Sequence, residues 1–142
     1  MDVTPSDVER VPGENLRLSR AEFGAVWAEA ERRQAEQAAG GVTDWYVGGV
    51  VVTCRWVARA TVRPEGRPWR QARSPVTGTT RLAHAELIER ECLAAEVLDM
   101  RHPVPEWLAG RPGWSAGIVA TFNWMWRGTA GPPVEVPRTA AG

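Results

Sequence analysis

Two apolar segments of this chain resemble each other, and the resemblance constrains the fold more than any other feature. GVVVTCRWVAR, residues 49–59, aligns without a gap on GIVATFNWMWR, residues 117–127, with five identities in eleven positions. On a helical wheel each segment gathers its polar side chains on one narrow stripe, which holds Arg55 and Arg59 in one copy and Asn123 and Arg127 in the other. A helix that is apolar around the rest of its circumference is a central one. The pattern therefore predicts two similar, tryptophan-rich central helices.

Two other structures compete for the first copy. As a strand over residues 45–62 it would place Arg55 and Arg59 on the same face as Val51, which separates polar from apolar side chains poorly. An α+β fold with this strand is the alternative to the helical prediction. A membrane span is excluded, because Arg55 interrupts the apolar run well short of the roughly 20 residues that a spanning helix needs.

Two more helices are predicted around this pair. Ser19 is an N-cap with Glu22 three residues later, and Gly40 follows the last helical turn. A second segment, rich in Ala, Leu and Glu, ends before the prolyl bond at Pro103. We therefore predict a mainly α fold, a compact bundle of about four helices over residues 20–39, 44–61, 78–100 and 113–127.

The chain has the usual size of one domain, at 142 residues. We expect a flexible N-terminus over residues 1–15, a single helical domain over 16–128 and a Pro-rich tail over 129–142. The N-terminal residues lack the apolar stretch of a secretory signal, and Cys54 and Cys92 lack CxxC spacing. We therefore expect a cytoplasmic protein with reduced, buried thiols.

Residues suited to catalysis are few. His84 and Glu91 lie seven positions apart, which places them about 10 Å apart on one face of a helix, but no further catalytic group accompanies them. We interpret Glu91 as the anchor for an arginine of a central helix, Arg59 or Arg127. Two histidines and two separated cysteines do not make a zinc site, and the glycines match no nucleotide-binding loop. We expect no catalytic site, no metal and no cofactor.

The sharpest surface feature is the loop 63–75, in which prolines argue against regular structure. Seven arginines fall between residues 55 and 81 against the single acid Glu65, and Trp69 stands among Arg67, Arg70 and Arg73. Arginine interleaved with an aromatic ring can contact phosphates and stack on bases. Since 17 basic residues balance 17 acidic ones, pairing of these arginines with the acidic stretches 29–36 and 86–99 is the favoured alternative.

Eight tryptophans are more than so small a domain buries easily. We expect Trp69, Trp107 and one of Trp124 and Trp126 to be exposed, and exposed tryptophan beside arginine is typical of interaction hot spots. The prediction is a non-enzymatic protein-interaction module or accessory subunit that binds another protein through Trp69, Arg67, Arg70, Arg73 and Trp107. Nucleic-acid binding through the loop 63–75 is the alternative, and a small enzyme acting near Cys92 and His84 is a third hypothesis.

Overall fold

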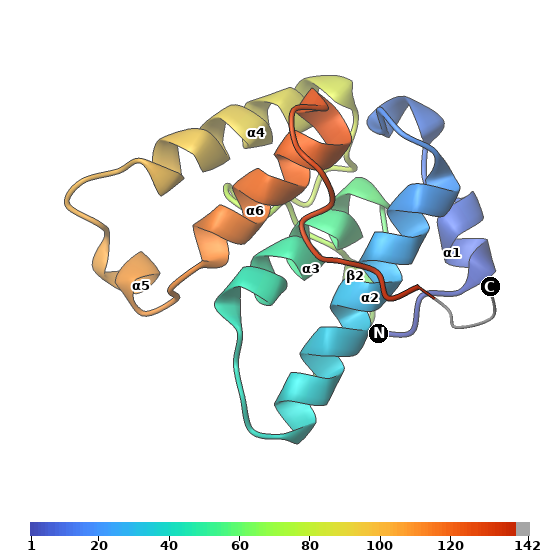
Figure 1. Cartoon of the computed structure of the whole chain (residues 1–142), viewed down its shortest axis with the longest axis horizontal. Helices are drawn as coiled ribbons and strands as arrows, with labels where there is room; N and C mark the ends of the chain where they lie inside the picture. Colours follow the sequence, from blue (N-terminus) through green and yellow to red (C-terminus); the bar gives the residue numbers. More distant parts are fainter. Residues whose placement is uncertain (139–142) are drawn as a thin grey trace.

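The computed structural model describes residues 1–138, and its regular structure is almost entirely helical (Figure 1). The mainly α prediction is confirmed, and the alternative strand over 45–62 is wrong because most of that range is a helix. The elements are α1 (Pro5–Glu9), a 3₁₀ turn (Gly13–Asn15), α2 (Arg20–Ala39), α3 (Trp45–Val57), β1 (Thr61–Val62), β2 (Arg70–Gln71), α4 (Ala85–Asp99), α5 (Glu106–Ala109), α6 (Trp114–Phe122) and a π-helical turn (Asn123–Arg127).

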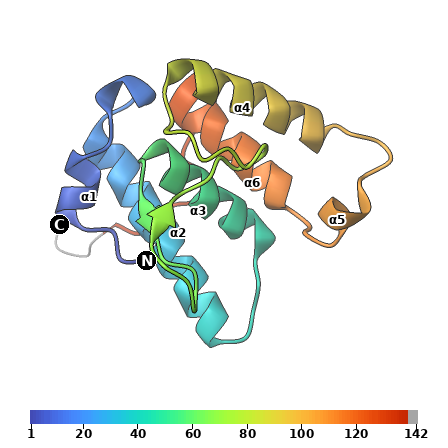
Figure 2. The same ribbon diagram turned by 180° about the vertical axis from the view of Figure 1, so that it is seen from behind.

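The two similar segments form a central helix pair. α3 and α6 lie side by side and run in the same direction (Figures 1 and 2). Their matched glycines permit this close approach: a Cβ on Gly49 would lie 2.2 Å from the carbonyl oxygen of Trp114, and a Cβ on Gly117 would lie 2.2 Å from that of Tyr46. Each glycine thus packs against the first turn of the other helix. The contact is reciprocal, so the sequence similarity marks equivalent positions in a nearly symmetric pair.

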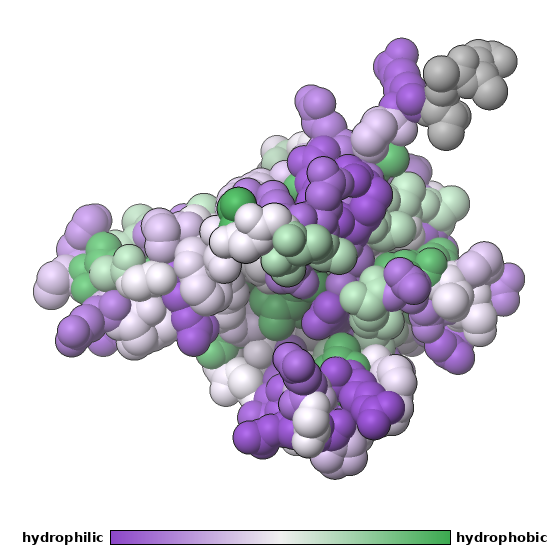
Figure 3. Space-filling view, turned by 90° about the horizontal axis from the view of Figure 1, so that it is seen from below, coloured by the Kyte–Doolittle hydropathy of each residue, from purple (hydrophilic) through white to green (hydrophobic). Residues whose placement is uncertain are grey.

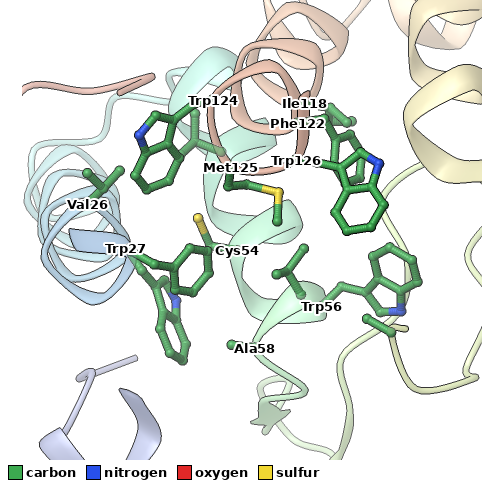
Figure 4. Packing of buried hydrophobic residues seen from close by; sticks show 14 of the residues in the cluster. Val26, Trp27, Cys54, Trp56, Ala58, Ile118, Phe122, Trp124, Met125 and Trp126 are labelled. Atoms are coloured by element: carbon green, nitrogen blue, oxygen red, sulfur yellow. The ribbon is translucent and has the colours of Figure 1, made fainter. Parts of the chain in front are cut away.

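Buried side chains surround this pair. Thr53 and Thr121, another matched couple, are fully buried and donate their hydroxyls to the carbonyls of the matched glycines at 2.8 Å. Figure 4 shows tryptophans from α2, α3 and the π-helical turn around the sulfur atoms of Cys54 and Met125. Because every polar atom of the two threonines is satisfied within its own helix, the helix interface stays apolar.

α2 has the bounds that its capping residues predict. The Ser19 hydroxyl accepts a hydrogen bond from the backbone N–H of Glu22 at 3.1 Å, and Gly40 ends the helix. Its core face places Phe23 parallel to the ring of Trp124, with centroids 6.0 Å apart. Trp124 and Trp126 are both buried, so the expectation that one of them is exposed was wrong.

α4 is shorter than the helix predicted over 78–100. It begins at Ala85, and the preceding residues form a loop held by the buried carboxylate of Glu91. That carboxylate accepts hydrogen bonds from the backbone N–H of Val76 at 3.3 Å and of Thr77 at 3.1 Å. Glu91 therefore anchors a loop, and not an arginine of a central helix as we expected.

α3 ends earlier than predicted, whereas the helix predicted over 113–127 reaches its predicted end through a π-helical turn. α3 ends at Val57, because Arg59 adopts the left-handed conformation (φ 56°) and the N–H of Ala60 returns to the carbonyl of Arg55 at 2.9 Å. The segment predicted as a helix over 113–127 divides into α6 and the π-helical turn. The left-handed conformation of Arg59 is unfavourable for a non-glycine residue. A hydrogen bond offsets this cost, because Arg59 Nε donates to the Ala83 carbonyl at 2.8 Å.

The first fifteen residues, which we expected to be flexible, contain α1 and the 3₁₀ turn. Thr4 and Asp7 form a reciprocal capping box, with hydrogen bonds of 3.1 and 2.9 Å. Val11 and Asn15 have no exposed surface, and the Asn15 amide donates to the Val57 carbonyl at 3.0 Å. A capping box and two buried side chains attach this segment to the bundle.

The described part of the Pro-rich tail crosses α2 and α3 (Figure 1). Val134 is 5 % exposed, the Tyr46 hydroxyl donates to the Pro133 carbonyl at 2.8 Å, and Arg33 Nη2 donates to the Glu135 carbonyl at 2.6 Å. Residues 139–142 of the predicted tail lie outside the described residues. An apolar anchor and two hydrogen bonds therefore hold residues 129–138 without any helix.

Glu29 orients the arginine that holds the tail, and its ionisation predicts a pH-dependent stability. The hydrogen bond from Arg32 lowers the pKa of Glu29 from 4.5 to about 2; burial opposes this change and the hydrogen bond from Arg33 adds to it. The folded chain thus binds this proton less tightly than the unfolded chain, so the carboxylate stabilises the fold above pH 4.5 and ceases to do so as the pH falls to about 2.

We expect Glu29→Gln to lower the urea midpoint at neutral pH, and the difference from the wild type to shrink to nothing between pH 4.5 and about 2. The measurement is a set of urea titrations followed by circular dichroism. Glu36→Gln is the matched control, because that carboxylate pairs with the same Arg32 but its side chain is 72 % exposed. A Glu29→Gln difference that does not change with pH would contradict the prediction.

Candidate functional site

The loop 63–75, predicted to lack regular structure, forms most of a short antiparallel hairpin whose first strand precedes it. Thr61 pairs with Gln71 and Val62 pairs with Arg70, while the N–H of Ala72 donates to the Ala60 carbonyl at 2.9 Å. The base of the hairpin is thus fixed to the end of α3. The ladder forms despite the prolines, because Pro64 and Pro68 lie in the connection between the strands, where no ladder donor is required, and Pro75 lies beyond the second strand.

A tight turn shapes the tip of the hairpin. The N–H of Arg67 donates to the Pro64 carbonyl at 3.0 Å, and Gly66 between them has a φ of 71°. This conformation favours glycine at the third position of a type II turn. The turn sends the chain back to Trp69, which directly precedes the second strand and lies on an exposed surface, with 64 % of the residue accessible.

The arginines of the hairpin are unpaired. Arg63, Arg67, Arg70 and Arg73 are exposed, and none forms an ion pair or a side-chain hydrogen bond with any residue in the described range 1–138. We expected them to pair with the acidic stretches of two helices. The expected pairing with the acidic stretches 29–36 and 86–99 is therefore wrong for these four arginines, and it holds for Arg55, which binds Glu31.

The acids of the helices bind partners outside the hairpin. Glu29 pairs with Arg32 and Arg33, and Glu89 and Glu96 of α4 lie 3.4 and 3.0 Å from Arg127. Arg127 thus meets acids of α4, but not Glu91, the acid that we expected to bind it. The guanidinium groups of the hairpin remain available to an external anion.

A groove of about 640 Å³ lies between the hairpin and the N-terminal segment. Both strands, the N-terminal residues and α3 contribute to its walls: Met1, Asp2, Asp7, Arg55, Thr61, Val62, Arg63, Pro64, Trp69 and Arg70. Burial opposes ionisation of Asp7, but hydrogen bonds from Thr4 and the Arg10 guanidinium outweigh it and lower the pKa of Asp7. The groove therefore presents both charge signs beside one exposed indole.

The guanidinium group of Arg55, which lines this groove, is held by a buried carboxylate. Its Nε and Nη2 donate to the two carboxylate oxygens of Glu31 at 2.7 and 2.6 Å, and the Glu31 side chain is 2 % exposed. The indole of Trp27 donates to the same carboxylate at 3.0 Å. Arg55 thus meets an acid of the stretch 29–36, one of the two acidic stretches with which we expected these arginines to pair.

A second hollow lies on the face around the α2–α3 connection. It has a volume of about 480 Å³ and is lined by the last turns of α2, the first turn of α3 and Trp114. Figure 3 views the molecule from below and shows apolar residues between strongly hydrophilic ones on this face. Its carboxylates already have partners: Asp44 caps α3 and Glu31 binds Arg55.

Trp107 lies far from the hairpin, at the α5 end of the molecule (Figures 1 and 2). It is 50 % exposed, and its ring meets that of Trp114 edge-on with centroids 6.0 Å apart. The guanidinium of Arg111 lies between 5.3 and 5.9 Å from the rings of Trp45, Trp107 and Trp114. The structure therefore brings together Trp69, Arg67, Arg70 and Arg73, and it places Trp107 on another surface.

His84 and Cys92, which we considered as candidates for catalysis, both take part in the structure of α4. His84 is the N-cap residue of α4, and Cys92 donates its thiol to Glu96 at 3.7 Å. Burial raises the pKa of the Cys92 thiol to about 11, partly offset by Arg127, and burial also raises the pKa of Cys54. Such thiols stay protonated near neutral pH and are poor nucleophiles. Within residues 1–138 no group of three or more His, Cys, Asp and Glu side chains is arranged to hold a metal ion.

Sequence reasoning missed two parts of these surfaces. We took Glu31 as one acid of the stretch 29–36, without expecting it to be buried. The only local indication of its burial is Trp27, four residues earlier, which binds it. No local sequence pattern predicted that Arg111 would lie among three indole rings, because the rings come from three separate segments.

No helix in the described chain is long and apolar enough to cross a membrane. Family models, curated proteins and solved structures were all compared with the chain, and none of them matches.

Proposed function

We propose that the chain is a non-enzymatic protein-interaction module that binds another protein through the hairpin surface, defined here as Arg67, Trp69, Arg70 and Arg73 with the adjoining groove. The observation that carries the proposal is Trp69, which is 64 % exposed at the edge of this groove while four other tryptophans are buried. Covering an indole of this exposure with a partner contributes about 3 kcal/mol. An indole with this exposure beside a groove therefore supports a binding role for this surface.

A protein partner fits the charges of the groove better than a nucleic acid does. Asp2 and Asp7 line the same groove as Arg63 and Arg70, so a continuous phosphate backbone would meet carboxylates as well as guanidinium groups. A protein segment can match both signs, and its acidic side chains would pair with the unpaired arginines. Unbonded, buried cysteines support the further proposal of a cytoplasmic location.

Nucleic-acid binding is the second candidate, and the unpaired hairpin arginines are the observation that favours it. When guanidinium groups that have no internal ion pair bind phosphates, counterions leave the nucleic acid. The exposed Trp69 ring can also stack on a base. This function requires affinity that falls steeply between about 50 and about 200 mM salt.

The test compares Trp69→Ala and Arg67→Glu/Arg70→Glu with the wild type. We expect crosslinking in a cell lysate followed by mass spectrometry to identify a partner with the wild type, and calorimetry with that purified partner to show at least about tenfold weaker binding by each variant. Arg90→Glu is the matched control, because this exposed arginine of α4 makes no ion pair with residues 1–138. Circular dichroism of every variant should match the wild type.

Two outcomes would contradict the proposal. A partner that binds the wild type and both variants equally would show that the hairpin surface takes no part. Salt-sensitive binding of single- or double-stranded DNA or of RNA, lost in Arg67→Glu/Arg70→Glu, would select the second candidate instead.

A further inference from the structure

A second surface lies at the other end of the molecule, on the outer face of α4. Leu93, Val97 and Met100 follow helical spacing and are 49, 69 and 77 % exposed, and Val104 beyond the helix end is 48 % exposed. The opposite face of α4 supplies core residues, so its orientation is fixed by packing. We call these four residues the α4 stripe. Contiguous exposed apolar side chains of this kind mark interaction sites.

A hollow of about 340 Å³ continues the α4 stripe. Val104 belongs to both, and Leu98, Leu108, Ala109 and Pro112 supply further apolar lining between the end of α4, α5 and the start of α6. The hollow also contains two arginines, Arg101 and Arg111, and one acid, Asp99. The Asp99 carboxylate already accepts the Ser115 hydroxyl at 2.8 Å. Two guanidinium groups against one carboxylate leave the lining of the hollow with a net positive charge.

Arg111 is oriented for recognition of an anion. Its guanidinium carbon lies 5.3, 5.9 and 5.6 Å from the ring centroids of Trp45, Trp107 and Trp114. Stacking on rings restrains the planar group without using its N–H donors. Neither Arg111 nor Arg101 forms an ion pair or donates a side-chain hydrogen bond within residues 1–138. A carboxylate can therefore bind Arg111 in the bidentate manner without displacing an internal partner.

From these contacts we infer that this end of the molecule binds an acidic amphipathic helix of a partner protein. The apolar face of that helix covers the α4 stripe, one of its side chains enters the hollow, and its carboxylates pair with Arg111 and Arg101. Recognition of an amphipathic helix by such a surface uses anchors at successive helical turns. The surface shares no residue with the hairpin surface, so this inference stands apart from the function proposed above.

The charges argue against a second copy of the chain as the occupant. The exposed large apolar residues outside this end of the molecule lie in loops, the N-terminal segment and the tail, so a copy offers only its own α4 stripe. That stripe is flanked on the same helix face by Glu86 and Arg90 near one end and by Arg101 near the other. A second copy would therefore bring one carboxylate that is unpaired within residues 1–138, Glu86, to a surface with two unpaired guanidinium groups, Arg101 and Arg111. A partner helix with several carboxylates can pair with both guanidinium groups.

The test uses two synthetic fluorescent peptides of equal length, both with leucines at the a and d positions of a helical repeat, one with glutamates and the other with lysines elsewhere. We expect the glutamate peptide to bind the intact chain by fluorescence polarisation and the lysine peptide not to bind. Val97→Glu/Met100→Glu and Arg111→Gln should each weaken binding at least about tenfold. Arg111→Lys should also bind weakly, because an ammonium group cannot reproduce the stacked, bidentate geometry.

Two controls separate this surface from the rest of the chain. Val42→Glu adds the same charge at another apolar residue, which is 57 % exposed, and should bind like the wild type. Trp69→Ala should also bind like the wild type, which distinguishes failure of this inference from failure of the hairpin proposal. Circular dichroism checks that each variant is folded.

Four results would overturn the inference. They are absence of binding by the glutamate peptide, equal binding by the lysine peptide, light scattering that shows a dimer dissociated by Val97→Glu/Met100→Glu, and tight binding to vesicles of anionic and neutral phospholipid that the same substitution abolishes. The third would identify a second copy as the occupant, and the fourth a membrane surface.

Discussion

Gly49→Ala is expected to destabilise the protein by about 3 kcal/mol, while Gly48→Ala at the neighbouring position is expected to stabilise it by about 0.5 kcal/mol. The new methyl group at Gly49 would lie 2.2 Å from the Trp114 carbonyl oxygen, so α3 and α6 would have to separate. At Gly48 the nearest atom outside the helix is the Gln34 amide nitrogen at 3.7 Å, an ordinary contact. Alanine there gains only the helix propensity that glycine lacks.

Chemical denaturation of the two variants and of Gly117→Ala measures these effects. Gly117→Ala should match Gly49→Ala, because its methyl group would lie 2.2 Å from the Tyr46 carbonyl oxygen in the reciprocal contact. The double variant should cost less than the sum of the two single substitutions, since one separation of the helices relieves both clashes. Equal stability of Gly48→Ala and Gly49→Ala would show that the two helices do not approach closely.

Glu31→Ala is expected to cost about 3 kcal/mol, because it leaves the partly buried guanidinium of Arg55 without its bidentate partner. The Trp27 indole N–H would lose its acceptor as well. The loss comes mainly from the groups left unpaired and only partly from the attraction between the two charges. Removal of both charges should therefore cost less than removal of one.

Glu31→Leu/Arg55→Met tests that reasoning. In urea titrations at neutral pH we expect it to be more stable than Glu31→Ala. It should remain about 1 to 2 kcal/mol less stable than the wild type, because the Trp27 indole N–H lacks its acceptor in both variants. Arg90→Met is a control, because this exposed arginine of α4 makes no ion pair within residues 1–138. A double variant less stable than Glu31→Ala would mean that the ion pair stabilises the fold by net attraction.

Features set by neighbouring residues could be predicted from the sequence. The bounds of α2 follow from Ser19 and Gly40, which act within one turn of the helix ends. The central position of α3 and α6 follows from two similar apolar segments, since such helices are stable only when other elements cover them. Trp69 and Trp107 could be expected at the surface because their neighbours in sequence are proline, arginine and glutamate.

Contacts between distant segments could not be predicted in this way. The start of α4 depends on the Glu91 carboxylate, which holds the backbone of Thr77 in a loop. Threonine is a common N-cap residue, so the local sequence alone favours an earlier start of the helix. The free arginines of the hairpin depend on a competition that Arg127 and Arg33 win by lying closer to the helix acids. Sequence spacing shows which residues can pair, and only the folded geometry decides which pairs form.

The reciprocal glycine contact also has a consequence for folding kinetics. The two helices that meet there are separated by nearly half the chain, so the closure entropy of a very long loop must be met before either glycine gains its contact. Neither central helix can bury its apolar surface alone, which ties both halves of the chain into one cooperative unit. A cut in the exposed stretch around Gly78 should leave two fragments that fold only by recombining with each other.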